Sequence, residues 1–139
     1  MRYLGLDLGS RTLGVAISDK TGLIASSHCI IRHNAEYERL VDEVSKMVNE
    51  YDIDEIVLGY PKNMNNTIGE KALLSEKFKS LLENNLQKPV HLVDERLTTK
   101  QAQDMLISND TSRKKRKKVI DSLAATIILQ SYLDKKEKV

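Results

Sequence analysis

An acidic residue inside an apolar strand pattern is the feature that most constrains this chain. The stretch LGLDLGSRTLGVAIS sets Asp7 among residues typical of interior strands, including Leu4, Leu6 and Val15. A buried carboxylate costs several kcal/mol unless it is hydrogen-bonded, paired with a cation or bound to a metal. The fold must therefore supply a partner for Asp7, either backbone amides in a structural role or a ligand in a functional one.

The first half of the chain reads as three strands followed by a helix. Strand-like runs at 2–8, 13–18 and 26–32 are separated by short polar breaks that contain glycine and suit hairpin turns. Apolar residues at helical spacing over 37–51 predict a helix, with Asn34 as its cap.

The second half alternates strands with helices. The run IDEIVLGYP predicts a strand ending at Pro61, a helix follows over about 70–85, and Pro89 starts the strand VHLVDERL. A capping-box spacing at Thr98 and Gln101 predicts a short helix, and a last amphipathic helix follows a basic run. The order β-β-β-α-β-α-β-α-α indicates an α/β fold, with a mixed sheet and helices packed on its faces.

Composition fits one domain over residues 1–139, with 40% hydrophobic and 30% charged residues. No apolar run approaches the roughly 18 residues that span a bilayer, and no signal-peptide pattern opens the chain. We therefore expect a cytoplasmic protein without a membrane partner, acting as a monomer or a homodimer.

Acidic residues occupy three conspicuous places. Asp7 is in mid-strand, Asp94 and Glu95 close the last predicted strand, and Asp121 opens the predicted final helix. Adjacent strand residues point to opposite faces of a sheet, so only one of Asp94 and Glu95 can share a site with Asp7. The small residues Ala124 and Ala125 would let the helix of Asp121 approach the sheet closely.

Each of these acids also has a purely structural interpretation. Backbone amides could satisfy Asp7, and Glu95 could pair with Arg96 or Lys100 at the sheet edge. Asp121 in a first helical turn would interact favourably with the helix dipole.

Taken together, the acids indicate a metal site. Three converging carboxylates repel one another unless cations lie between them, and oxygen ligands of this kind suit Mg²⁺ or Mn²⁺. Two such ions can activate a water and stabilise the leaving oxygen in phosphodiester cleavage. His28, His33 and His91 are scattered through the strand runs or their ends and form no zinc pattern.

Two segments could bind phosphate. The loop after Asp7 contains Ser10 and Arg11, which together with backbone amides could hold a phosphate oxygen, although the loop could equally be a simple hairpin turn. The second segment is an unbroken run of six cations, namely Arg113, Lys114, Lys115, Arg116, Lys117 and Lys118.

The basic run changes the charge balance of the chain. Of its 22 Lys and Arg residues, six lie in this run, which leaves 16 against 20 Asp and Glu. The run could be a solvated segment, but it leads almost directly into Asp121, so nucleic acid bound there would lie near the proposed metals. With one Phe and no Trp, recognition through phosphate and shape is favoured over base stacking.

Four motifs resemble those of the YqgF/RuvX family of bacterial nucleases, which has a ribonuclease H-like fold. They are LGLDLGSRTLGVAISD, VLGYPKNMNNT, VDERLTT and IDSLAATIILQSYL, in the family's order and spread over nearly the whole chain. One departure is Asn66, where the family commonly has a glycine. Members are described as Holliday junction resolvases and as nucleases that process pre-16S ribosomal RNA.

The resemblance implies a mixed five-stranded sheet whose first three strands are antiparallel. It implies catalytic and metal-ligand roles for Asp7, Glu95 and Asp121, and so selects Glu95 over Asp94. It favours processing of the 5′ end of pre-16S RNA, with Holliday junction resolution as the alternative. The nucleic-acid partner is thus a structured RNA precursor or branched DNA.

Two other functions fit the fold less well. Sugar-kinase-like ATP-binding proteins share the core, but they need a second phosphate loop and an adenosine motif that this chain lacks. A non-catalytic nucleic-acid-binding module would not need all three acids.

Overall fold

A mixed five-stranded sheet forms the centre of the protein. The structure is a computed structural model that describes residues 1–60, 69–94 and 113–137, apart from the side chains of 94, 113–122 and 137. The strand order is β3-β2-β1-β4-β5. The strands are β1 (Tyr3–Leu8), β2 (Thr12–Ser18), β3 (Ala25–Arg32), β4 (Glu55–Tyr60) and β5 (Val90–Asp94).

The pairing directions confirm the predicted sheet. β1 pairs with β2, and β2 with β3, in antiparallel fashion, whereas β4 runs parallel to both β1 and β5. Short turns suffice for the antiparallel pairs, while each parallel pair needs a crossover. The helices α1 (Tyr37–Glu50) and α2 (Glu70–Leu86) lie in those crossovers.

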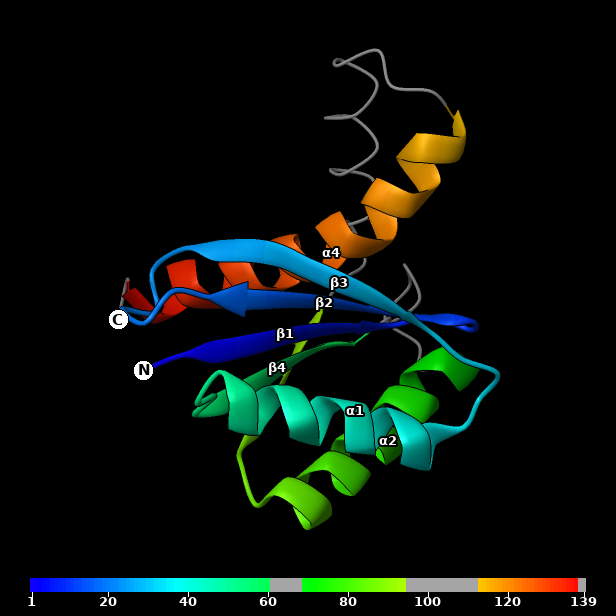
Figure 1. Ribbon diagram of the computed structural model, residues 1–139, viewed down its shortest axis with the longest axis horizontal. Coiled ribbons are helices and arrows are strands. Elements are labelled where there is room, and N and C mark those ends of the chain that lie inside the picture. The colour runs from blue at the N-terminus through cyan, green and yellow to red at the C-terminus, as the bar shows by residue number, and fades with distance from the viewer. Residues whose placement is uncertain (61–68, 95–112, 138–139) are drawn as a thin grey trace.

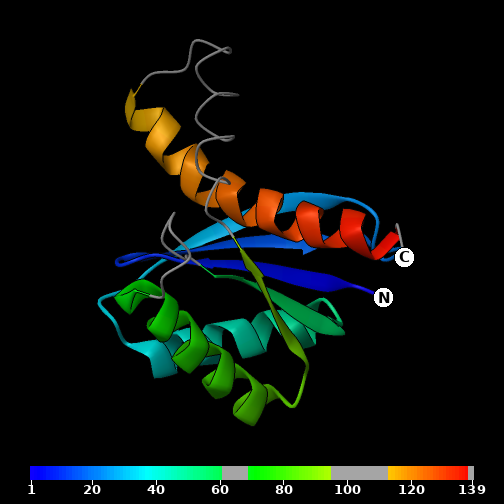
Figure 2. The same ribbon diagram turned by 180° about the vertical axis from the view of Figure 1, so that it is seen from behind.

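Helices cover both faces of the sheet. Figure 1 shows α1 and α2 on one face and α4 (Arg113–Glu137) on the other, and the reverse view in Figure 2 agrees. The first turns of α4, yellow in both views, project beyond the sheet. The protein therefore has three layers, with β1 at the centre of the sheet.

The larger core lies between the sheet and α1 and α2. Leu40, Val44 and Val48 recur every four residues along α1 and are buried against Leu4 and Leu6 of β1. This helical period, read from the sequence, is why the segment buries one face and leaves its charged residues in solvent.

The second core lies between the sheet and α4. It contains three strand residues and four helix residues, namely Tyr3, Ala16, Val57, Ala125, Ile128, Leu129 and Leu133. Alternation along β1 therefore directs Leu4 and Leu6 toward α1 and α2, and the intervening positions toward α4.

Two predicted helix starts are wrong. The cap of α1 is Glu36 rather than Asn34, because Ala35 adopts a left-handed conformation (φ 66°) that separates Asn34 from the helix. The last helix begins at Arg113, eight residues before Asp121, so the basic run is helical. Lys and Arg are good helix formers, and this propensity outweighs their mutual repulsion and the unfavourable dipole end.

Other details refine the sequence analysis. The strand predicted to start at Pro89 begins at Val90, and α2 matches its predicted range within a residue. Two apolar residues of α2, Leu73 and Leu74, are exposed rather than buried. The helix predicted from Thr98 lies outside the described residues. Within the ranges that are described, no helix is both long enough and apolar enough to cross a bilayer.

Candidate functional site

Asp7 lies near the carboxyl end of the central strand, on the face that α4 covers. It has the same strand parity as Tyr3 and Gly5, which both contact α4, and its register partner on β2 is Gly14. Its side chain is half-buried. The acid predicted to stand alone in an apolar strand is thus found between a sheet and a helix, where its desolvation would be costly without partners.

The approach of α4 to β1 is unusually close at Gly5. A Cβ atom on Gly5 would lie 2.7 Å from the Cβ of Leu129 and 3.1 Å from the carbonyl oxygen of Ala125. Both Ala124 and Ala125 are buried, which confirms the predicted small-residue contact of this helix. The absence of a side chain at Gly5 lets the two backbones meet.

The direction of α4 follows from its contacts with β1. The rings of Tyr3 and Tyr132 lie 5.8 Å apart, and Lys136 Nζ is 4.6 Å from the Tyr3 ring centroid, whereas Gly5 faces Ala125. The helix therefore runs antiparallel to β1, and its backbone before Ala125 lies toward the end of the strand where Asp7 is found.

The backbone of α4 gives Asp121 a position, although its side chain lies outside the description. Position 121 is one helical turn before Ala125, and residues four apart share a helix face. The interpretation of Asp121 as a first-turn residue that favours the helix dipole is wrong, because two turns of helix precede it.

The third predicted ligand, Glu95, lies outside the described residues. The preceding strand β5 ends at Asp94, which pairs in register with Tyr60 of β4. β1, β4 and β5 all run in the same direction, so the carboxyl ends of these strands share one end of the sheet with Asp7. Crevices at the carboxyl ends of parallel strands are the usual ligand sites of open α/β sheets.

Histidines have structural partners. His91 Nε2 lies 2.9 Å from Glu55 Oε1, and the ring of His28 meets that of Tyr51 edge-on with centroids 5.1 Å apart. His33 is buried and bonded at both ring nitrogens. Among the described side chains, no three His, Cys, Asp or Glu residues group as they would around a metal ion.

The loop between β1 and β2 is a tight turn that exposes its polar residues. The Gly9 N–H donates to the Thr12 carbonyl oxygen at 2.7 Å, and Ser10 and Arg11 extend into solvent. The predicted hairpin is confirmed, and it leaves both proposed phosphate-binding side chains accessible.

Arg11 also lines a cavity of about 320 Å³ that the sequence analysis did not anticipate. Two further arginines, Arg32 at the end of β3 and Arg39 in α1, border the same cavity. Nothing local in the sequence links them, and the only usable signal is that β2 and β3 form a hairpin, which pairs Thr12 with Arg32.

The basic run 113–118 belongs to the first turns of α4, which project past the sheet on the side opposite α1 and α2 (Figure 1). A helix at this place sets six consecutive cationic residues ahead of position 121 on one element. Whether these cations bind substrate stays a prediction, since their side chains are outside the description.

Solved structures with the same fold include two of RuvC from Thermus thermophilus. The structure of RuvC in complex with a Holliday junction substrate has a TM-score of 0.62 and 14% sequence identity, with 99% of this chain and 96% of that chain covered. A second RuvC structure has a TM-score of 0.59 at 14% identity, covering 99% of this chain and 97% of that one. At this identity the likeness establishes the fold, which is ribonuclease H-like.

Sequence comparison finds much closer relatives. Proteins named "Putative pre-16S rRNA nuclease" from Geobacillus sp. (strain WCH70) and Bacillus subtilis (strain 168) are 51% and 53% identical over 138 and 135 residues. The matches cover 99% and 96% of this chain, and 100% and 98% of the relatives. The family model "RuvX: Holliday junction resolvase" matches residues 1–135. The chain therefore belongs to the RuvX family and is a nuclease, a hydrolase of phosphodiester bonds.

Proposed function

We propose that this protein is a divalent-metal-dependent endonuclease that trims the 5′ end of pre-16S ribosomal RNA. We further propose that residues 1–139 form one nuclease domain, acting in the cytoplasm where ribosomes are assembled. The choice of RNA rests on the names of relatives that are 51% and 53% identical over nearly the whole chain.

The face of the sheet on which each strand residue lies is the observation that carries the assignment of the active site. Asp7 lies on the same face as Tyr3, which packs against α4. On β5, Val90 and Leu92 pack toward α1 and α2, whereas Val93 packs with the α4-side cluster.

Alternation along β5 supports one of the two adjacent acids at positions 94 and 95 over the other. Position 94 is two residues after Leu92 and therefore lies on the same face of the sheet, opposite to that of Asp7. If the alternation continued, position 95 would lie on the face that α4 covers. This supports Glu95, and argues against Asp94, as the partner of Asp7.

The three proposed ligands would come from three places in the fold. Asp7 belongs to β1, Glu95 directly follows the last residue of β5, and position 121 lies in the turn of α4 before Ala125. Neighbouring strands are about 4.8 Å apart, and only β4 separates β1 from β5, so roughly 10 Å lies between their backbones. Carboxylates reaching inward over that span would leave room for cations and a phosphate between them.

The donor set fits Mg²⁺ or Mn²⁺, which prefer carboxylate oxygens and readily keep water and phosphate ligands. Asp7, Glu95 and Asp121 would hold two such ions, which supply an activated water and stabilise the leaving oxygen. The chain's own contribution is to fix the carboxylates on a rigid sheet and helix, and to bind the substrate strand through Ser10, Arg11 and the basic run.

Ligand substitutions test this proposal. Asp7→Asn, Glu95→Gln and Asp121→Asn should each leave the protein folded and remove most cleavage of a pre-16S RNA in Mg²⁺. Because removing any ligand disables the same site, a double variant should be hardly worse than a single one. Double losses that equal the product of the single losses would contradict a shared site. A large loss of stability in Asp7→Asn would instead favour a structural carboxylate.

Resolution of Holliday junctions is the second candidate, favoured by the description of the matching family model. Depletion of the protein in cells, with mapping of 16S 5′ ends, distinguishes the two substrates. Extended 5′ ends are the expected result. Mature ends together with accumulating recombination junctions would transfer the proposal to DNA, and a protein that cleaves neither nucleic acid in any metal would be a binding module.

A further inference from the structure

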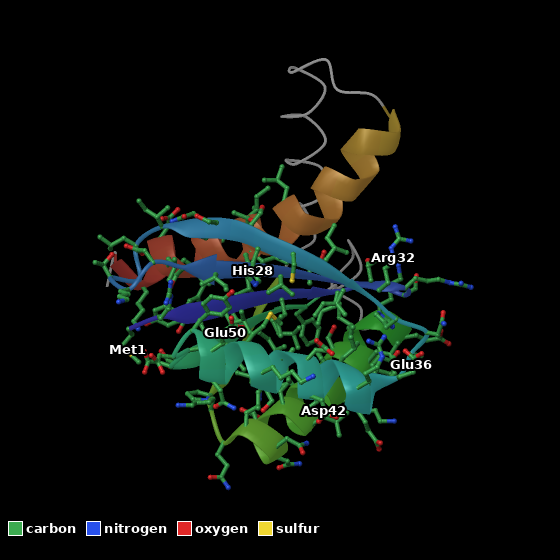
Figure 3. The ribbon with its side chains drawn as sticks, in the orientation of Figure 1. Met1, His28, Arg32, Glu36, Asp42 and Glu50 are labelled. Carbon is green, nitrogen blue, oxygen red and sulfur yellow. The ribbon has the colours of Figure 1, made fainter. Side chains whose placement is uncertain are left out.

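Three arginines from separate elements border one cavity at the end of the sheet. The cavity measures about 320 Å³, and its arginines come from the β1–β2 turn (Arg11), the end of β3 (Arg32) and α1 (Arg39). Figure 3 shows Arg32 at the end of β3 and Glu36 at the entry to α1. The remaining lining residues are Thr12, His33, Asn34 and Glu36.

The positive charges of this cavity are only partly neutralised. Arg39 pairs with Glu36 at 3.4 Å and donates to the Arg32 carbonyl oxygen at 2.7 Å. Arg11 and Arg32 are exposed, and no carboxylate in the described ranges forms an ion pair with either. The pKa of Glu36 is lowered, chiefly because the Asn34 N–H donates to its carboxylate, so Glu36 is ionised and offsets one of the three cations.

His33 holds the walls of the cavity in place. The Ala35 N–H donates to Nδ1 at 3.0 Å, which assigns the proton to Nε2, and Nε2 donates to the Gly9 carbonyl oxygen at 3.0 Å. The His33 N–H also donates to the Arg11 carbonyl oxygen at 2.9 Å. The turn after Asp7 is thereby fixed to the β3–α1 connection, so the backbone positions that carry Arg11 and Arg32 are held in place before any ligand binds.

The cavity lies beside the proposed active site. Across the sheet, Asp7 of β1 pairs with Gly14 of β2, which pairs with Ile30 of β3. Arg32 lies two residues after Ile30, so its position is on the same face of the sheet as Asp7. Two strand spacings across the sheet and two residues along β3 together separate the backbones of Asp7 and Arg32 by roughly 12 Å. An arginine fork binds phosphate oxygens in bidentate fashion, and an anion would relieve the repulsion among the three cations.

We propose that this cavity binds a backbone phosphate of the substrate strand, a few nucleotides away from the phosphate that is cleaved. The inference rests on the proposed nuclease site and adds a second anchor to it. Its role is positioning: it fixes the direction in which the strand crosses Asp7, and it reads no base.

The test uses three single variants of the full chain. Arg32→Gln removes one cation from the cavity, and Lys46→Gln is the control because Lys46 is an exposed cation of α1 outside the cavity. Glu36→Gln removes the one anion while keeping an oxygen that can accept from the Asn34 N–H. Affinity for a labelled pre-16S leader RNA and for a four-way DNA junction is measured against salt in Ca²⁺, and cleavage in Mg²⁺.

Arg32→Gln should weaken binding of the leader RNA roughly five- to tenfold at low salt and reduce the log–log salt slope by about 0.7–0.9. The KM should rise with kcat largely retained, since the phosphate is held equally well before and during cleavage. Glu36→Gln should bind more tightly than the wild type, an effect that a merely structural role would not produce. The junction should respond in the same sense, because the cavity binds phosphate rather than bases.

If Arg32→Gln and Glu36→Gln match the Lys46→Gln control in affinity and slope, the cavity binds no phosphate. That result would leave the proposed function intact as long as the wild type cleaves and Asp7→Asn does not. If the wild type cleaves nothing yet Arg32→Gln still weakens binding, the cavity stands and the proposed nuclease site fails.

Discussion

Gly5→Ala probes the contact on which both the fold and the proposed site depend. The new Cβ would lie 2.7 Å from Leu129 Cβ and 3.1 Å from the Ala125 carbonyl oxygen, whereas carbon atoms pack at about 3.5–4.0 Å. Both neighbours are fixed to the helix backbone, so no change of rotamer relieves the overlap. The helix must therefore move away from β1 by roughly 1 Å.

The expected cost is that of an overpacked core, about 2 kcal/mol in the free energy of unfolding. Urea unfolding with an unchanged m-value measures it, and the melting temperature should fall by about 3 °C for each kcal/mol. Because α4 carries position 121 past Gly5 toward Asp7, the same shift should disturb the metal ligands. A displacement near 1 Å can reduce kcat by up to about 100-fold while the protein is still folded.

Ser26→Ala is the matched control, since Ser26 is an exposed residue of β3 and its replacement should change stability by less than about 0.5 kcal/mol. If Gly5→Ala is as stable and as active as Ser26→Ala, the close approach of α4 does not constrain the fold. If Gly5→Ala loses stability but keeps full kcat when folded, α4 does not position a catalytic ligand.

Three further outcomes follow from the structure. Replacing the four lysines of 113–118 with Gln should weaken the binding of any RNA sequence. The slope of log affinity against log salt concentration should fall by up to about 0.7–0.9 for each phosphate that is no longer neutralised, as fluorescence anisotropy in Ca²⁺ would measure. An unchanged slope would mean that the run is only a solvated helix end. Cleavage should proceed in Mg²⁺ or Mn²⁺ and poorly in Ca²⁺, whose looser coordination misplaces the attacking water, and equal rates would defeat the metal mechanism. Asp19 accepts hydrogen bonds from Thr21, Ile24 and Leu23, which lower its pKa from 3.8 to about 2. The ionised Asp19 therefore stabilises the folded protein fully at a pH above its pKa in the unfolded chain, and this stabilisation is lost as the pH falls toward 2. Asp19→Asn should flatten that part of the stability–pH curve in urea unfolding, and a curve of unchanged shape would contradict the assignment.

The sequence by itself determined most of the secondary structure and the order of its elements along the chain. Alternation identified β1 to β3, and a helical period over four turns identified α1, because each pattern is set by which neighbours along the chain share a face. Helix ends were less predictable. The start of α4 depends on whether six cations tolerate a helix, and the cap of α1 depends on a left-handed turn at Ala35, and neither has a periodic signature.

The residues of the site divide in the same way. Asp7 could be singled out from sequence because a charge in an apolar strand is anomalous wherever the strand lies. Alternation alone could not choose between positions 94 and 95, because it gives two faces of the sheet but not which of them α4 covers. The family resemblance favoured Glu95, and the packing of β5 supports that choice. Arg32 and Arg39 could not be linked to Arg11 from sequence at all, because a hairpin register, a helix start and the bonds of His33 bring them together across separate elements. Local patterns report neighbours along the chain, and only the tertiary structure decides which distant side chains share a cavity.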